Sequence, residues 1–293
     1  MHELLRGPGR ALGRDVLRRR RLPLAALAAG LVVAAAAPAA AERPAEVNAR
    51  YVVSFAGVDI GWFQFNSKSN GARYDATGNA KVRLLFGAVK WTGTMSGSGV
   101  IEGGEVRPAR YSQVFKSRRK LAFRSKKKTR TAELRFSGAK VATADVSPPR
   151  KTKGRVPLAP KHFRNVLDPL GALVSLTNPI TGRDPCKRQV AIFDGRQRFA
   201  LTLTPKRKVR LSGGTGHVCR VRYRPVAGHK ADSKENRELA QGRSIEVTLR
   251  AVDGADILVP HEVSVPTRAG TAKLMARSVE VLTAGQQRIA FTN

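Results

Sequence analysis

The sequence predicts an all-β protein with a strongly curved antiparallel sheet, a half-barrel or open barrel that one short helix plugs or flanks. Two observations predict this fold. Apolar and polar residues alternate over several long runs after residue 50, and turn-forming residues fall where the runs stop. Long antiparallel strands in a meander must twist and curl, so the expected sheet is curved.

The alternation has the period of two that is typical of strands. Successive side chains of a strand point to opposite faces, so an apolar residue at every second position indicates one buried and one solvated face. The clearest runs cover residues 82–86, 132–136, 199–203 and 245–249. We expect a strand at each of these places.

Glycine-containing dipeptides separate the runs. Asn-Gly and Asp-Gly supply the positive φ angles that tight hairpins need, so they predict antiparallel neighbours. The dipeptides that punctuate the runs are Asn70-Gly71, Gly103-Gly104, Asp194-Gly195, Asp253-Gly254 and Ala269-Gly270.

One segment, residues 161–178, has the spacing of a short helix. Asp168 suits the N-cap, Pro169 the first helical position, and Asn178-Pro179 the stop. We expect this helix to plug one mouth of the curved sheet; the alternative is a helix on its outside. The apolar residues of the segment are Val166, Leu167, Leu170, Leu173, Val174 and Leu176.

Two stretches lack periodicity. Residues 147–160 are rich in Pro, Lys and Arg, which predicts an exposed connection. This loop break is not a firm domain boundary, because strands on either side can share one sheet. Residues 228–243 predict a long polar loop with one helical turn around residues 235–239.

The N-terminus resembles a secretory signal peptide. A basic stretch, residues 18–21, precedes an apolar run from Leu22 to Ala37, and small residues follow up to Ala41. A basic head, a short apolar middle and a small-residue exit are the marks of such a signal. We expect residues 1–41 to be cleaved near Ala41, leaving residues 42–293 as a single periplasmic β domain. An uncleaved N-terminal membrane anchor is the alternative.

The chain is strongly basic, with a net charge of +33. Residues 1–41 contribute +5, seven arginines against Glu3 and Asp15, so residues 42–293 keep +28. Such an excess attracts polyanions: nucleic acid, anionic lipid headgroups, or acidic polysaccharide and lipopolysaccharide. Export argues against nucleic acid as the partner. The chain also uses Arg heavily, and a general compositional bias of this kind would add positive charge that has no role in binding.

The densest charge cluster lies between residues 116 and 130. Clustered cations bind phosphates or carboxylates with strong salt dependence, and the alternative is a solvated hairpin tip that is merely basic. Residues 206–210 hold a smaller cluster, and the sparse aromatic residues argue against base stacking. The nine candidate anion-binding residues are Lys116, Arg118, Arg119, Lys120, Arg124, Lys126, Lys127, Lys128 and Arg130.

The two cysteines, Cys186 and Cys219, both follow the predicted leader. Cysteines in an oxidising compartment most often pair, so we expect a disulfide between them. The alternative is a metal set that recruits His217. That set is one ligand short of a structural zinc site and has no Cys-x-x-Cys pair.

Common catalytic motifs are absent from the sequence. It contains no Gly-x-Ser-x-Gly elbow, no His-Glu-x-x-His and no nucleotide loop ending in Gly-Lys-Ser or Gly-Lys-Thr. Its histidines have no metal-site spacing, and its carboxylates form no evident pair. We therefore expect a protein that is not an enzyme and that holds neither a metal nor a cofactor.

Several ordered motifs resemble the bacterial exported family called domain of unknown function 3108. They span nearly all of residues 42–293, and the resemblance implies a β-rich envelope domain with no catalytic residues to carry over. The motifs are Tyr51 with Gly57 and Ile60-Gly61, Asp168-Pro169-Leu170, the run 186–203, the run 219–228, Leu258-Val259-Pro260 and Gly270-Thr271.

The sequence thus predicts a monomeric periplasmic protein that binds a lipidic or amphipathic anionic ligand, such as a lipopolysaccharide-like molecule, with peripheral membrane contact. The alternative is a structural or assembly factor that docks on another envelope protein or an acidic polysaccharide through its basic loops. A cell-wall hydrolase would need a carboxylate pair, which the sequence does not offer.

Overall fold

The computed structural model describes residues 45–70, 72–121, 124–177, 184–212, 214–241, 245–253, 255, 257–283 and 285–292. The predicted signal peptide, residues 1–41, lies outside these residues, and so do Gly71, Gly254 and the Asn178-Pro179 stop. Within this part of the chain, no helix is both long and apolar enough to span a membrane.

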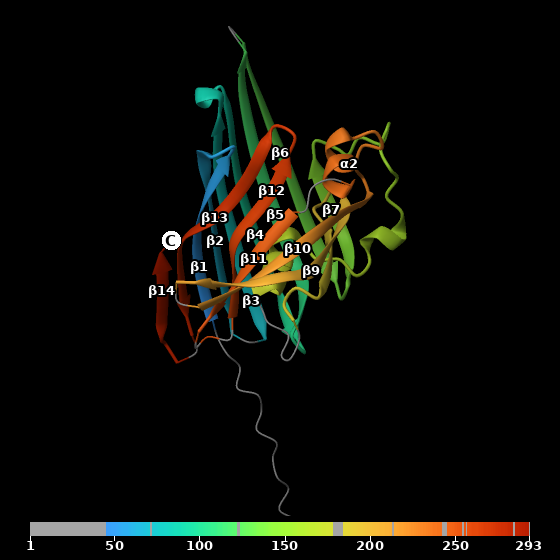
Figure 1. Ribbon diagram of the computed structural model, residues 1–293. Coiled ribbons are helices and arrows are strands. Elements are labelled where there is room, and N and C mark those ends of the chain that lie inside the picture. The colour runs from blue at the N-terminus through green and yellow to red at the C-terminus, as the bar shows by residue number, and fades with distance from the viewer. Residues whose placement is uncertain are drawn as a thin grey trace, which may run out of the picture. The chain divides into compact units, whose positions relative to one another are not determined.

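The described residues form one antiparallel sheet of fourteen strands, built from two meanders (Figure 1). The first comprises β1 (Ala45–Phe55), β2 (Val58–Ser69), β3 (Arg73–Leu84), β4 (Val89–Glu102), β5 (Glu105–Leu121), β6 (Arg124–Ser137) and β7 (Lys140–Ser147). The second comprises β8 (Arg188–Phe193), β9 (Arg198–Leu211), β10 (Gly214–Ala227), β11 (Ile245–Val252), β12 (Ile257–Thr267), β13 (Gly270–Leu282) and β14 (Arg288–Thr292). Pairing of β1 with β13 joins the meanders, and the order runs from β7 at one edge to β8 at the other.

The predicted strands are confirmed, with one shorter strand, and so are the turns at Gly103-Gly104, Asp194-Gly195 and Ala269-Gly270, which lie among the described residues. Gly103 and Gly104, at φ 57° and 81°, make the turn between β4 and β5. The alternation through residue 86 predicts a longer third strand, but β3 ends at Leu84 and a 3-10 turn, Leu85–Gly87, follows. Leu85 has φ 51°, outside the extended region, so the strand cannot continue through it.

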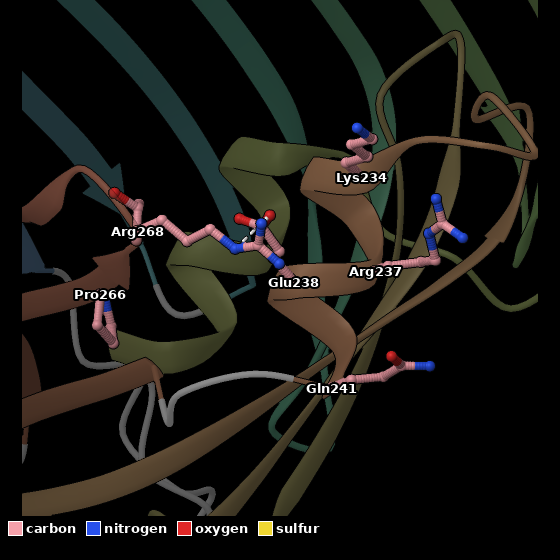
Figure 2. A pocket seen from close by; sticks show the side chains of 7 residues that line it. Lys234, Arg237, Glu238, Gln241, Pro266 and Arg268 are labelled. Atoms are coloured by element: carbon pink, nitrogen blue, oxygen red, sulfur yellow. Dashed lines mark ion pairs between the residues drawn. The ribbon is translucent and has the colours of Figure 1, made fainter.

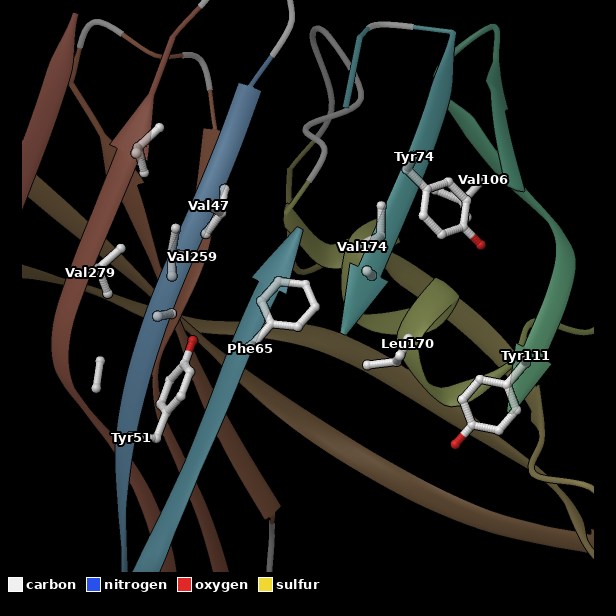
Figure 3. Close-up of a cluster of buried hydrophobic side chains, with 14 of the residues drawn as sticks. Val47, Tyr51, Phe65, Tyr74, Val106, Tyr111, Leu170, Val174, Val259 and Val279 are labelled. Carbon is white, nitrogen blue, oxygen red and sulfur yellow. The ribbon is translucent and has the colours of Figure 1, made fainter. Parts of the chain in front are cut away.

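The sheet curves around one main core, whose side chains Figure 3 shows. Val141 of β7 and Phe193 of β8 belong to the same buried cluster as Phe65 of β2 and Val279 of β13. Strands from both ends of the sheet therefore face a common interior, which a flat sheet of this width could not achieve. The predicted open, strongly curved sheet is confirmed.

The helix α1 (Pro169–Thr177) lies on this inner face. Its buried Leu170 and Val174 belong to the main core, and the helix packs against β3, β4 and β5 as well as β8 and β12 (Figure 3). Of the two placements that the sequence left open, the helix inside the curved sheet is therefore the one found.

The helix begins at Pro169, the first helical position that the sequence predicts. Asp168 is the N-cap, and its Oδ1 accepts the backbone N–H groups of Leu170 and Gly171, both at 2.9 Å. Val166 and Leu167 precede this cap and lie outside the helix. Leu167 pairs with β8 instead: its N–H donates to Ala191 O at 2.8 Å.

The edge strands β7 and β8 are not neighbours in the sheet, and residues 164–167 lie between them. Asn165 N–H donates to Ala139 O beside β7, whereas Leu167 bonds to β8. The β8–β9 turn also packs on the opposite end of the sheet: a Cβ on Gly195, which has φ 90°, would lie 2.7 Å from Ala132 Cβ of β6. We call this junction of the two sheet edges the seam.

Two irregular segments differ from expectation. The loop expected to hold one helical turn contains α2 (Lys234–Gln241), because Ser233 Oγ caps it by accepting Asn236 N–H at 3.2 Å. The connection after β7 is exposed at most of its residues, as expected, but it is half-buried at Arg150 and Arg155. Both guanidinium groups bond to backbone carbonyls across the seam, which holds the connection against the sheet.

The predicted disulfide is present. Cys186, just before β8, joins Cys219 of β10 with a Cα–Cα distance of 5.2 Å. Both residues are buried in a second apolar cluster with Leu203 and Leu249. The bridge therefore ties the segment after α1 to the second meander, and neither thiol is left as a metal ligand.

The double variant Cys186→Ala/Cys219→Ala should be less stable than the wild type by about 3 kcal/mol, because the bridge restricts the unfolded chain. Urea unfolding with and without reductant measures the difference. Reductant should lower the wild-type midpoint and leave the variant unchanged; equal sensitivity of both would contradict this assignment.

The Asp168→Asn variant should be more stable than the wild type at neutral pH. Burial raises the pKa of Asp168 to about 6. An acid whose pKa is raised in the folded state loses stability as pH rises from about 4 to about 6, because ionisation then disfavours folding. Asn keeps the capping oxygen without the charge. We expect a gain of up to about 3 kcal/mol above that range and none below it, measured by urea unfolding at a series of pH values. A gain independent of pH would contradict this account.

Candidate anion-binding surface

The β5–β6 hairpin carries all nine predicted anion-binding cations. β7 pairs with β6 only from Thr131 onward, so residues 124–130 of β6 lie at the edge of the sheet with exposed side chains. Figure 1 shows this green hairpin rising above the neighbouring strands. The geometry thus presents the charges on a hairpin ribbon at the edge of the sheet, which β4 flanks on the β5 side as far as Arg119.

Strand alternation divides the nine cations between the two faces of the ribbon. Leu134 of β6 is buried, so every second residue before it shares the inner face. The register places Arg119 opposite Lys126 on the inner face and Arg118 opposite Lys127 on the outer face. The inner set is Arg119, Arg124, Lys126, Lys128 and Arg130; the outer set is Lys116, Arg118, Lys120 and Lys127.

An aromatic pair lies beside the inner set. The rings of Trp91 on β4 and Phe115 on β5 have centroids 4.9 Å apart. With Ser117 they line a groove of about 400 Å³, and cations of the inner set form its other side. We call this the inner groove; its cations are Arg119, Lys126, Lys128 and Arg130.

The contribution of Trp91 could not be seen from the charge cluster alone. It lies well before residue 116 in the sequence and reaches the cations only because β4 pairs with β5, which places it opposite Ser117. The alternation of β4 is the sequence pattern that could have placed Trp91 on the inner face, because it puts Trp91 on the same face as the buried Gly93 and Gly97.

A second cavity adjoins the inner groove at Lys128 and Arg130, which line both. It has a volume of about 410 Å³, and the connection after β7 and the β8–β9 turn supply its other walls. We call it the proline cavity, after Pro148, Pro149 and Pro157. Its remaining cations are Arg150, Lys151, Arg155 and Arg196.

These cavities carry an excess of positive charge. None of the described residues that line them is acidic, and the ion pairs within the described part of the chain leave out all nine cations of the hairpin. The neighbouring Arg130 lowers the pKa of Lys128, and Lys151 contributes in the same direction. Mutual repulsion of this kind favours binding of an anion.

The smaller predicted cluster differs, because an acid partly neutralises it. On β9, Lys206 bonds to Glu246, and an Arg207 nitrogen lies 3.9 Å from the same carboxylate. A further pocket lies between α2 and the β12–β13 turn, where Arg268 pairs with Glu238 at 2.9 Å (Figure 2). Paired charges make both places weaker candidates for anion binding than the hairpin.

Fold and site together define a class of protein: an all-β, disulfide-bridged protein with an open curved sheet, an internal helix and a cationic surface on one hairpin. The model of the family described as "Protein of unknown function (DUF3108)" matches residues 50–277. The chain belongs to this family, which confirms the resemblance drawn from its motifs.

One solved structure with a similar fold is a beta-barrel-like protein of domain of unknown function DUF1849 from Brucella abortus. It shares 9% sequence identity with this chain, and the match covers 80% of this chain and 96% of that one with a TM-score of 0.48. Among curated proteins, none matches the sequence.

Proposed function

We propose that this protein is exported to the periplasm and binds an anionic amphipathic component of the envelope without catalysing a reaction. The leader-like residues 1–41 and the excess of positive charge support export and an anionic ligand. Anionic lipids and lipopolysaccharide-like molecules are the amphiphiles that such a compartment offers.

The inner groove carries this proposal. An amphiphile needs an apolar surface for its chain and cations for its headgroup, and the groove supplies both within one cavity. Trp91 and Phe115 form the apolar part of its lining, and Arg119 and Lys126 are among the cations that line the same groove. The groove lies on the inner face of the hairpin, so the bound chain would lie against the sheet.

The outer set favours a second candidate function. Lys116, Lys120 and Lys127 are exposed on the far face of the same ribbon, where the inner groove does not need them. An assembly factor that docks on another envelope protein or an acidic polysaccharide would use these residues. Amphiphile binding would therefore depend on the inner set, and docking on another envelope component would depend on the outer set, on the opposite face of the same hairpin.

Charge reversal on each face separates the two functions. The cross-strand pairs give matched variants, Arg119→Glu/Lys126→Glu on the inner face and Arg118→Glu/Lys127→Glu on the outer face. We expect wild-type protein, produced from the full chain, to bind monomeric dodecyl phosphate in isothermal titration calorimetry. The inner variant should bind about tenfold more weakly, since two charge contacts are lost and reversed.

The outer variant is the control and should bind within about twofold of the wild type. Dodecyl maltoside, which has the same chain and no charge, should bind more weakly than dodecyl phosphate. Equal losses in both variants would contradict the inner groove as the site, and absence of binding by the wild type would contradict the proposed function.

Export makes a separate prediction. Protein expressed from the full chain in bacteria should be recovered from the periplasmic fraction, and its N-terminal sequence should begin near Glu42, after the small residues that end the leader. A product that keeps residues 1–41 and sediments with membranes would instead indicate the uncleaved anchor.

A further inference from the structure

The proline cavity brings together cations from three separate parts of the chain. Lys128 belongs to β6 at one end of the sheet, Lys151 to the connection after β7, and Arg196 to the β8–β9 turn at the other end. The cavity therefore lies over the seam, where the two edges of the sheet meet without pairing.

Backbone carbonyls hold the arginines of this cavity in place. Arg150 Nε donates to Gly195 O at 2.7 Å, and Arg155 Nη1 donates to Gly228 O at 2.7 Å. Arg196 Nη2 donates to Ser147 O at 2.8 Å and to Pro148 O at 2.7 Å. These partners are neutral, so they fix the guanidinium groups without cancelling their charge.

The charge of the cavity is unbalanced. Burial, and then the neighbouring Arg130, lower the pKa of Arg196 against the opposing effect of Asp194. Arg196 Nε is buried and has no hydrogen-bond partner among the described residues. Several cations held around one cavity that no described acidic residue lines are the arrangement that an anion with several acceptor oxygens would complete.

We propose that the proline cavity binds a phosphate group, a phosphomonoester or diphosphate, and that the bound anion fastens the seam of the sheet. Phosphate oxygens accept several charge-assisted hydrogen bonds at once, so one group can engage β6, the connection and the β8–β9 turn together. The inference deepens the proposed function and rests on it for one source of the ligand: the headgroup of an amphiphile bound in the adjoining inner groove, at the place where Lys128 and Arg130 line both cavities. The other source is a free phosphate compound.

Thermal unfolding and calorimetry with inorganic pyrophosphate test this inference. Pyrophosphate at about ten times its dissociation constant should raise the unfolding midpoint of the full-chain protein by about 3 °C, because it binds the folded state only. Sodium chloride at equal ionic strength should not. An equal rise with the chloride salt would overturn the inference, since it would mean charge screening alone.

A matched pair of variants locates the site. Lys151 lines the cavity, whereas Lys153, two residues later and also exposed, does not. Lys151→Glu should weaken pyrophosphate binding by about tenfold, and Lys153→Glu by less than about twofold. Arg196→Gln, checked for folding by circular dichroism, should also weaken binding. Equal effects of Lys151→Glu and Lys153→Glu would overturn the assignment.

Titration of the same variants with dodecyl phosphate shows whether the phosphate group comes from an amphiphile or from a free compound. If Lys151→Glu weakens dodecyl phosphate and pyrophosphate alike, the phosphate is the headgroup of the amphiphile. If it weakens pyrophosphate alone, the cavity serves a free phosphate compound. A wild-type protein that binds pyrophosphate but does not bind dodecyl phosphate would support the phosphate site in the proline cavity and contradict the proposed function. The phosphate site and the proposed function can therefore fail separately.

Discussion

Leu170 and Val174 of α1 pack into a core that strands from both ends of the sheet share, and the rest of the structure depends on this contact. Apolar side chains on the inner face are removed from water only if the sheet curls around something that fills its concavity, and the helix does so. Asp168 makes this position specific, because it caps the helix while being buried itself. The curvature, the seam and the inner surface of the hairpin follow from this packing.

The seam shows how a very basic chain holds its edges together. Like charges on β6, the connection and the β8–β9 turn repel one another, which would open the junction if nothing opposed it. Backbone contacts of Asn165 and Leu167 and the carbonyl partners of Arg150 and Arg196 oppose the repulsion. The positive potential remains, however, and it is concentrated where two cavities meet. This combination suits a protein whose folded form is completed by an anion.

Position on the ribbon gives the cations different surroundings. Side chains two residues apart on β6, such as Lys126 and Lys128, share the inner groove, whereas Lys127 between them faces away. Four of the inner residues line a groove together with aromatic rings, whereas the outer ones do not. One hairpin can therefore present an amphiphile-binding surface on one face and a docking surface on the other.

The sequence by itself determined the strands, most of the turns, the helix cap and the disulfide. These features depend on local rules: alternation for the strands, positive φ at Gly104, side-chain capping by Asp168, and the pairing of Cys186 with the only other cysteine. The sequence also determined the cationic cluster, because charge is a property of composition. It could not divide that cluster between faces until the register of β5 with β6 was known.

Only the tertiary structure placed Trp91 beside Lys126 and brought Arg196 to Lys128, because these contacts join residues far apart in the chain. It also decided that Leu167 pairs with β8, since the edge of β8 offers backbone partners that no local pattern reveals. The physical reason is the same in each case: curvature of the sheet is a collective result of packing, and it sets which distant residues meet.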